Sequence, residues 1–144
     1  MKLNKRPLRW LIVLLVVTIA ACASPEQKKM KYFESGKAYY EKGEYAKAVI
    51  EFKNAIQIDP KFADAHYMLG MSYLKQRDFR QAYGSFSQAV ESNPDQLDAQ
   101  AGLGKILLVS GKKDEAMEKA RLVLTKNPDH AEALMLKAAY LVSS

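Results

Sequence analysis

Three residues of the sequence carry side chains suited to chemistry: the lone cysteine, Cys22, and two histidines, His66 and His130. A single cysteine permits no disulfide within the chain. Neither histidine has a cysteine or carboxylate partner at the spacing of a metal site, so a packing role is expected for His66. The sequence contains no phosphate-binding loop, nucleophile motif or dinucleotide fingerprint. We therefore expect no enzymatic activity, no metal and no cofactor.

Three carboxylates, Asp64, Asp98 and Glu132, recur 34 residues apart near predicted helix starts, where they favour the helix dipole rather than a catalytic pair. The same interval separates many small, aromatic and proline residues. These are Gly36, Gly70 and Gly104; Ala48, Ala82 and Ala116; Phe52 and Phe86; and Pro60, Pro94 and Pro128. A fixed period of this length, with apolar residues at helical spacing inside each unit, is typical of stacked helical repeats. Each unit is predicted to be two short helices.

The repeated residue types have physical reasons. A glycine in the middle of a helix costs about 1 kcal/mol relative to alanine, which indicates that a neighbouring helix comes close there. The alanines are the small residues expected across that contact, and Phe52 and Phe86 are expected to fill the space beside it. Each proline cannot continue the preceding helix and so ends a unit.

These residues resemble the tetratricopeptide repeat (TPR) family, whose pattern has an aromatic-x2-Leu-Gly-x2-Tyr first helix and an Ala-x3-Phe-x2-Ala second helix before a proline. The three copies are Tyr32, Ser35, Gly36, Tyr39, Ala48, Phe52, Ala55 and Pro60; His66, Leu69, Gly70, Tyr73, Ala82, Phe86, Ala89 and Pro94; and Gln100, Leu103, Gly104, Leu107, Ala116, Ala120, Val123 and Pro128. The third copy lacks aromatic residues. The resemblance implies an all-α, right-handed α-solenoid over residues 29–144. Its repeats would be 29–62, 63–96 and 97–130, followed by a partial unit, 131–144.

Residues 1–22 do not follow the repeat pattern. Residues 1–10 carry four basic side chains and no acid, and an apolar run too short for a comfortable membrane span follows. The run ends in Ile-Ala-Ala-Cys at residues 19–22, which resembles a bacterial lipobox. That resemblance implies a signal peptide over residues 1–21 and a lipid on Cys22, followed by a short polar tether. A retained anchor, or a secretory signal with an incidental cysteine, remains an alternative.

The polar stretch at residues 23–29 is predicted to be a flexible link between anchor and repeats. Without the four basic residues of the signal, the formal charge falls from +6 to +2. A charge this close to neutral does not indicate nucleic acid as a partner. In lipoproteins of two-membrane bacteria, an aspartate after the lipidated cysteine favours the inner membrane. Ala23 stands there instead, which implies a lipid-anchored protein at the outer membrane that faces the periplasm.

In the TPR family the first helix of each repeat lines a concave groove that binds protein segments. The positions that match are Phe33, Lys37, Tyr40, Glu41, Tyr67, Met71, Leu74, Lys75, Ala101, Lys105, Leu108 and Val109. The apolar members suit an extended or helical peptide, and the lysines are placed to meet acidic groups. Some of these residues are expected to pack against neighbouring helices instead. The carboxylate clamp of chaperone-binding relatives is not matched, because Phe33 and Lys37 occupy the slots of the first unit.

Two classes of function therefore compete. The first is a lipid-anchored adaptor of an envelope assembly or export system. Its lipobox, tether and first repeats resemble the start of TPR lipoproteins of the PEP-CTERM/exosortase and exopolysaccharide system, and lipoproteins of type IV pilus biogenesis share these features. The second is a periplasmic holdase chaperone.

Residues 130–142 are predicted to form the first helix of a fourth unit. Leu134, Ala138 and Leu141 would pack on the third repeat, while Ala133, Leu136 and Tyr140 would form an open apolar edge. Such an edge marks a contact site. We expect a longer array to continue there, or the edge to dock a partner or a second copy of the chain.

Overall fold

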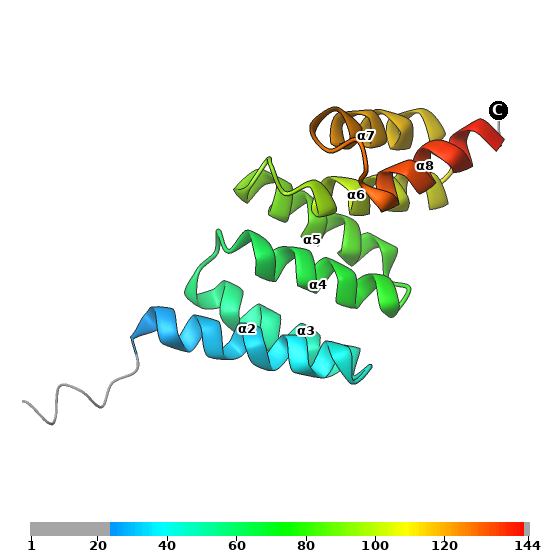
Figure 1. Ribbon diagram of the computed structural model, residues 1–144. Coiled ribbons are helices and arrows are strands. Elements are labelled where there is room, and N and C mark those ends of the chain that lie inside the picture. The colour runs from blue at the N-terminus through cyan, green and yellow to red at the C-terminus, as the bar shows by residue number, and fades with distance from the viewer. Residues whose placement is uncertain (1–23, 143–144) are drawn as a thin grey trace, which may run out of the picture.

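The computed structural model describes residues 24–142, and this part of the chain is helical with no strand. Its seven helices are α2 (Pro25–Glu41), α3 (Tyr45–Ile58), α4 (Ala63–Lys75), α5 (Phe79–Ser92), α6 (Leu97–Val109), α7 (Lys113–Lys126) and α8 (Ala131–Val142) (Figure 1). None of these helices is both long and apolar enough to cross a membrane.

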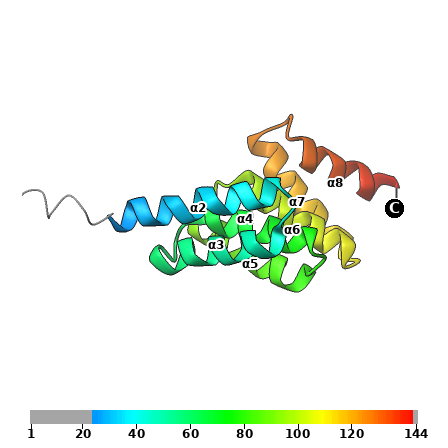
Figure 2. The same ribbon diagram turned by 90° about the horizontal axis from the view of Figure 1, so that it is seen from below.

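The helices pack as consecutive pairs. We call α2, α4, α6 and α8 the first helices and α3, α5 and α7 the second helices. Each first helix packs on the second helix that follows it and on the one before it, and α8 lies against α6 and α7. The pairs stack one on the next, with α2 and α8 at opposite ends (Figures 1 and 2). The predicted all-α solenoid of three pairs and a terminal helix is confirmed.

The turns inside the pairs repeat the same backbone conformation. Gly43 and Gly111 have φ of 76° and 78°, in the left-handed region where glycine carries no steric penalty. The turn of the second pair uses Arg77 at the same register, with φ of 63°. A non-glycine residue is uncommon in this conformation, so the repeat geometry holds Arg77 there against its local preference.

The connections between pairs confirm the role predicted for the prolines. The second helices end at Ile58, Ser92 and Lys126, just before an extended Asp59, Asn93 or Asn127. A side-chain oxygen of each of these residues accepts a hydrogen bond from the backbone N–H two residues later, at 3.1, 3.1 and 3.2 Å. This local turn, together with the following proline, redirects the chain into the next first helix.

The core lies between the helices of each pair and between successive pairs. Phe52 and Phe86 are fully buried. A Cβ atom on Gly36 would lie 2.6 Å from Phe52, and one on Gly70 would lie 2.7 Å from Phe86. These glycines are therefore required by the rings that pack on them, as the repeat pattern predicts.

The third pair fills the same space differently, and the predicted faces of α8 are wrong. Ala120 stands where the other pairs have phenylalanine, and a Cβ on Gly104 would meet Leu136 at 2.7 Å. Leu136 is therefore buried rather than open, at 5% exposure, because it occupies space that the missing ring leaves. Ala133 is fully buried at the register of Ala65 and Ala99, which are fully buried as well. The third member of the predicted edge, Tyr140, is half-buried and donates a hydrogen bond to Asp114 at 3.1 Å.

The residues predicted to pack inward are the exposed ones. Leu134 and Leu141 are 43% and 64% exposed, and Ala138 is also exposed. The open apolar face of α8 thus exists, but it consists of Leu134, Ala138 and Leu141.

The flexible link predicted over residues 23–29 is also wrong where the structure describes it. Helix α2 already begins at Pro25, because Ser24 forms a capping box with Gln27 and proline is favourable in the first turn. The first turns of α2 are held down by Lys29, which is 9% exposed. Its ammonium pairs with Glu26 at 2.8 Å and Asp59 at 2.9 Å, and it lies 4.7 Å from the ring of Phe62.

Candidate binding surface of the first helices

Groups on the other three first helices affect the ionisation of Tyr67 of α4. Burial raises the pKa of its phenol to about 12, with further contributions from Asp98 of α6, Glu132 of α8 and Tyr40 of α2. The carboxylate of Glu132, two repeats away, thus contributes to the raised pKa of this hydroxyl. We call the surface around Tyr40, Tyr67, Asp98 and Glu132 the first-helix face.

The residues predicted to bind a partner lie on or beside this face. Lys75 and Lys105 are exposed, and the other seven are half-buried: Phe33, Lys37, Tyr40, Tyr67, Met71, Leu74 and Leu108. Several also serve the core, as expected. The ring centroid of Phe33 lies 4.8 Å from that of Phe62, and Tyr67 lies 5.9 Å from Phe86. Of the further positions at this register, Ala101 is fully buried and Val109 is exposed.

Two of the three lysines already have partners within the chain. Lys37 pairs with Glu34 at 3.1 Å, and Lys105 pairs with Glu132 at 3.1 Å. The sequence predicts that these lysines meet acidic groups of a partner, but their charges are compensated by neighbouring carboxylates. Only Lys75 of the three makes no ion pair among residues 24–142.

A second set of polar contacts joins successive repeats across this face. Gln96 donates a hydrogen bond to Asp64 at 2.9 Å, and His130 Nε2–H donates to Asp98 at 3.0 Å. His130 Nδ1 accepts from the N–H of Ala133 at 3.4 Å, which fixes this arrangement of donor and acceptor. The sequence analysis does not predict a role for Gln96. A signal was present, because Gln96 and His130 share the 34-residue register and follow Asp64 and Asp98 by 32 residues each.

The remaining candidates for chemistry have simpler roles. His66 is 8% exposed and donates a hydrogen bond from Nε2 to the carbonyl of Pro60 at 2.9 Å, which confirms its packing role. Asp64, Asp98 and Glu132 lie in the first turns of α4, α6 and α8. Within residues 24–142, no three His, Cys, Asp or Glu side chains are grouped to hold a metal. The predicted lipidation residue, Cys22, lies outside the described residues.

The surface as a whole has aromatic rings at its centre, with carboxylates and lysines around them. Tyr40 and Tyr67 supply the rings, and Glu34, Asp64, Asp98 and Glu132 supply carboxylates from all four first helices. Such a surface can bind a polypeptide segment through ring contacts, cation–π contacts and hydrogen bonds to carboxylates.

Solved structures of TPR domains share this fold. The Arabidopsis OM64 TPR domain matches with a TM-score of 0.80 at 19% identity, over 84% of this chain and 100% of its own. The second TPR domain of human RPAP3, in complex with the HSP70 peptide SGPTIEEVD, matches with a TM-score of 0.76 at 22% identity, over 81% and 98%. The first TPR of Spaghetti (RPAP3), bound to the HSP90 peptide SRMEEVD, matches with a TM-score of 0.76 at 23% identity, over 82% and 95%. At these identities the likeness is one of fold.

The family comparison agrees with the structure. The TPR repeat family matches residues 36–76, and the tetratricopeptide repeat family matches residues 67–131. Among curated proteins, no significant match was found. Because the two matches together span residues 36–131 and the neighbouring structures are TPR domains, the chain belongs to the tetratricopeptide repeat family.

Proposed function

We propose that this protein is a membrane-anchored adaptor that faces the periplasm and binds a segment of a partner protein on its first-helix face. The convergence of Tyr40, Tyr67, Asp98 and Glu132 from four different helices supports this function. Aromatic side chains that are half-buried lose little conformational freedom when a partner covers them, so they suit recognition rather than catalysis. Like other TPR domains, the chain then acts as a scaffold and not as an enzyme.

The charges of the face select the kind of segment. The RPAP3 and Spaghetti domains were solved with peptides that end in Glu-Glu-Val-Asp. Here Lys37 and Lys105 are compensated by Glu34 and Glu132, while Asp64 and Asp98 add negative charge. An acid-ended peptide would therefore meet these carboxylates and, of the three lysines, only Lys75 without an ion pair within residues 24–142. The face fits an apolar segment with basic or uncharged side chains.

The anchor in this proposal is a lipid on Cys22. The capped start of α2 at Pro25 leaves only Ala23 and Ser24 between that residue and the first helix. Lys29 fixes the start of α2 to Asp59, so the repeats would be held close to the membrane with little freedom. Ala23 after the cysteine favours the outer membrane. A place in an envelope assembly or export system, of the exopolysaccharide/PEP-CTERM type or the type IV pilus type, is consistent with this position.

The anchor is tested by metabolic labelling with radioactive palmitate and membrane fractionation. We expect the wild-type protein to be labelled and membrane-bound, and Cys22→Ser to be unlabelled and unprocessed or mislocalised. Equal labelling of both proteins would exclude lipidation at Cys22.

Partner binding is tested by placing a photo-crosslinking amino acid at Tyr67 in one protein and at Ile50 in another. Ile50 is 58% exposed on the second helix α3 and serves as the matched control. We expect a discrete cross-linked partner from position 67 and none from position 50. Asp98→Asn in the position-67 protein should reduce the yield if basic groups of the partner contact this face. Identical products from both positions would contradict the assignment of the face.

A holdase function is the second candidate, because α8 exposes Leu134, Met135 and Leu141, at 43%, 63% and 64%. Such apolar surface can hold unfolded clients. Suppression of aggregation across unrelated client proteins would favour the holdase. Co-purification with the components of one envelope machine would favour the adaptor.

A further inference from the structure

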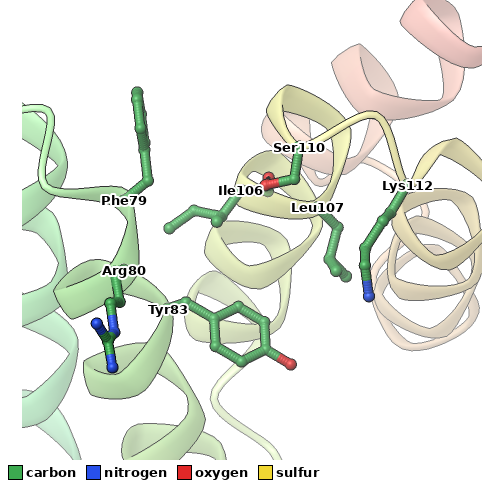
Figure 3. A pocket seen from close by; sticks show the side chains of 7 residues that line it. All are labelled: Phe79, Arg80, Tyr83, Ile106, Leu107, Ser110 and Lys112. Atoms are coloured by element: carbon green, nitrogen blue, oxygen red, sulfur yellow. Dashed lines mark hydrogen bonds between the residues drawn. The ribbon is translucent and has the colours of Figure 1, made fainter.

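A pocket of about 350 Å³ lies between the second and third helix pairs, where the start of α5 meets the end of α6 (Figure 3). It is lined by Phe79, Arg80, Tyr83, Ile106, Leu107, Ser110 and Lys112. Phe79 and Tyr83 are 38% and 45% exposed, although both are aromatic. Its floor is apolar, since Ile106 and Leu107 are buried at 3% and 5% exposure.

Two residues at the pocket depart from the repeat: Tyr83 stands at the register of Val49 and Met117, and Leu107 lacks an aromatic ring. Leu107 occupies the register of Tyr39 and Tyr73, so the third pair lacks their ring. At the preceding junction the ring of Tyr73 is 8% exposed and belongs to the core, where Lys53 of α3 lies 5.7 Å from its centroid. The shorter leucine leaves open the space beside Tyr83 of α5.

Two donors at the rim have no acceptor within residues 24–142, while Ser110 and Lys112 are engaged. Among residues 24–142, Arg80 makes no ion pair and the Tyr83 hydroxyl makes no hydrogen bond. The hydroxyl of Ser110 is engaged with the carbonyl of Ile106 at 2.8 Å. An unpaired guanidinium at the rim is matched by a carboxylate, which can accept two hydrogen bonds from Arg80.

The carboxylates near the pocket in sequence are already engaged. Asp78 accepts from the N–H of Gln81 at 3.1 Å, where it caps α5. Asp114 accepts from Tyr140 at 3.1 Å, and Glu115 pairs with Lys112 at 3.0 Å. Arg80 is exposed and makes no ion pair within residues 24–142, so its guanidinium is free to pair with an acid of another molecule.

The pocket lies on a different side of α6 from the first-helix face. Lys105 of α6 pairs with Glu132 on that face. At 100° per residue, Leu107 projects about 200° around the helix from Lys105, on the opposite side. A partner in the pocket and a partner on the first-helix face can therefore bind at the same time.

We propose that this pocket is a second docking site, for a segment of a partner protein in which a large apolar side chain stands next to a carboxylate. The apolar side chain enters the space beside Tyr83 and Leu107. The carboxylate pairs with Arg80 at the rim. The proposal does not depend on the function of the first-helix face, since it rests on other residues.

The test uses two capped peptides, acetyl-Gly-Phe-Asp-Gly-amide and acetyl-Gly-Phe-Asn-Gly-amide, titrated into the full chain and followed by NMR. We expect both to shift backbone resonances of residues 79–83 and 106–112. The acidic peptide should bind about fivefold more tightly, the weight of one solvent-exposed ion pair. Equal affinities would overturn the role of the carboxylate, and shifts confined to other residues would overturn the site.

Three variants sharpen the result. Arg80→Gln should remove the preference for the acidic peptide and leave binding of the neutral one unchanged, whereas Arg121→Gln, an exposed arginine on α7, should change neither. Leu107→Tyr restores the residue of the other repeats and should abolish binding of both peptides. If Leu107→Tyr fails to fold by circular dichroism, Phe79→Ala replaces it and should weaken both peptides at least threefold. Binding that survives these changes would exclude the pocket.

Discussion

A Cβ atom on Gly70 would lie only 2.7 Å from Cδ1 of Phe86, which is closer than real carbon atoms approach. The ring has no exposed surface, and it also reaches Gly102 of the next pair, where a Cβ would lie 2.9 Å away. Phe86 is thus the side chain that joins the second pair to the third. Its contacts depend on the absence of side chains on both glycines.

We expect Phe86→Ala to lower the free energy of unfolding by about 3–5 kcal/mol, because the truncation leaves a cavity between two pairs. Gly70→Ala should cost about 1–3 kcal/mol, since the ring must move to admit a methyl group. Urea denaturation followed by circular dichroism measures both. Ile50→Ala, at an exposed position of α3, is the control and should stay within about 0.5 kcal/mol of wild type. A Phe86→Ala protein as stable as this control would contradict the packing.

The third pair offers a test of complementary volume. Ala120→Phe adds a ring where Leu136 already sits against Gly104, so it should destabilise the protein by about 1–3 kcal/mol. Leu136→Gly alone should also destabilise, through a cavity and loss of helix propensity. The double variant reproduces the pairing of Phe86 with Gly102. It should therefore lose less stability than the sum of the single changes, as a double-mutant cycle in urea would show. Simple additivity would mean that the two side chains do not share the space.

This third pair also shows where prediction from the sequence stops. The 34-residue register fixes the place of each residue within a unit, so the glycines, phenylalanines and prolines could be assigned correctly. It does not say which neighbour fills a vacancy, and here Leu136 lies in the space that the missing ring at Ala120 leaves. The faces expected for α8 are wrong for a different reason: Ala133 stands at the register of Ala65 and Ala99, which are buried as well.

Other features depend on distances that no register supplies. The pairing of Lys37 and Lys105 with carboxylates required the positions of Glu34 and Glu132 on neighbouring turns and helices. By contrast, the early start of α2 has a signal in the sequence. Ser24 is followed by Pro25 and, three residues later, by Gln27, which together are typical of a capped helix start.

The link between Lys29 and Asp59 should make stability depend on pH. The hydrogen bond from Lys29 holds the pKa of Asp59 below its usual value of 3.8. A lowered pKa stabilises the folded state above pH 3.8, and this contribution is lost as pH falls through the folded value. Lys29→Met should therefore melt at a lower temperature than wild type at pH 7, and the difference should shrink below pH 3.8.

Thermal melts between pH 2 and pH 7 measure this effect. Lys61→Met is the matched control, because Lys61 is exposed and its side chain makes no ion pair within residues 24–142. A difference between wild type and Lys29→Met that persists at pH 2 would mean that Lys29 acts through its apolar stem or its contact with the ring of Phe62, not through Asp59.

Tyr67 should lose its proton at a higher pH than an ordinary tyrosine. Burial and the charges of Asp98 and Glu132 raise its pKa to about 12 from the model-peptide value of 10.0. A raised pKa means that the neutral phenol stabilises the fold below pH 10, and that this contribution is lost as pH rises towards 12. Absorbance at about 295 nm, where phenolates absorb, should show a late step that Tyr67→Phe removes. Tyr83→Phe, at an exposed position, should leave the late step in place.

The exposed face of α8 leads to a prediction about assembly. Leu134, Ala138 and Leu141 stand at the register of His66, Gly70 and Tyr73, which are buried in the second pair by the helix that follows. Helices at both edges of a repeat array normally present polar surfaces, and this face is apolar. We expect the protein to associate through it, with Leu134→Lys and Leu141→Lys together shifting the population towards monomer in sedimentation velocity. Leu122→Lys, at a 41% exposed leucine of α7, should leave the distribution unchanged. A wild-type chain that stays monomeric at high concentration would show that the face does not join two copies. The Leu134→Lys and Leu141→Lys substitutions would then be tested for their effect on binding of the partner that cross-links to position 67.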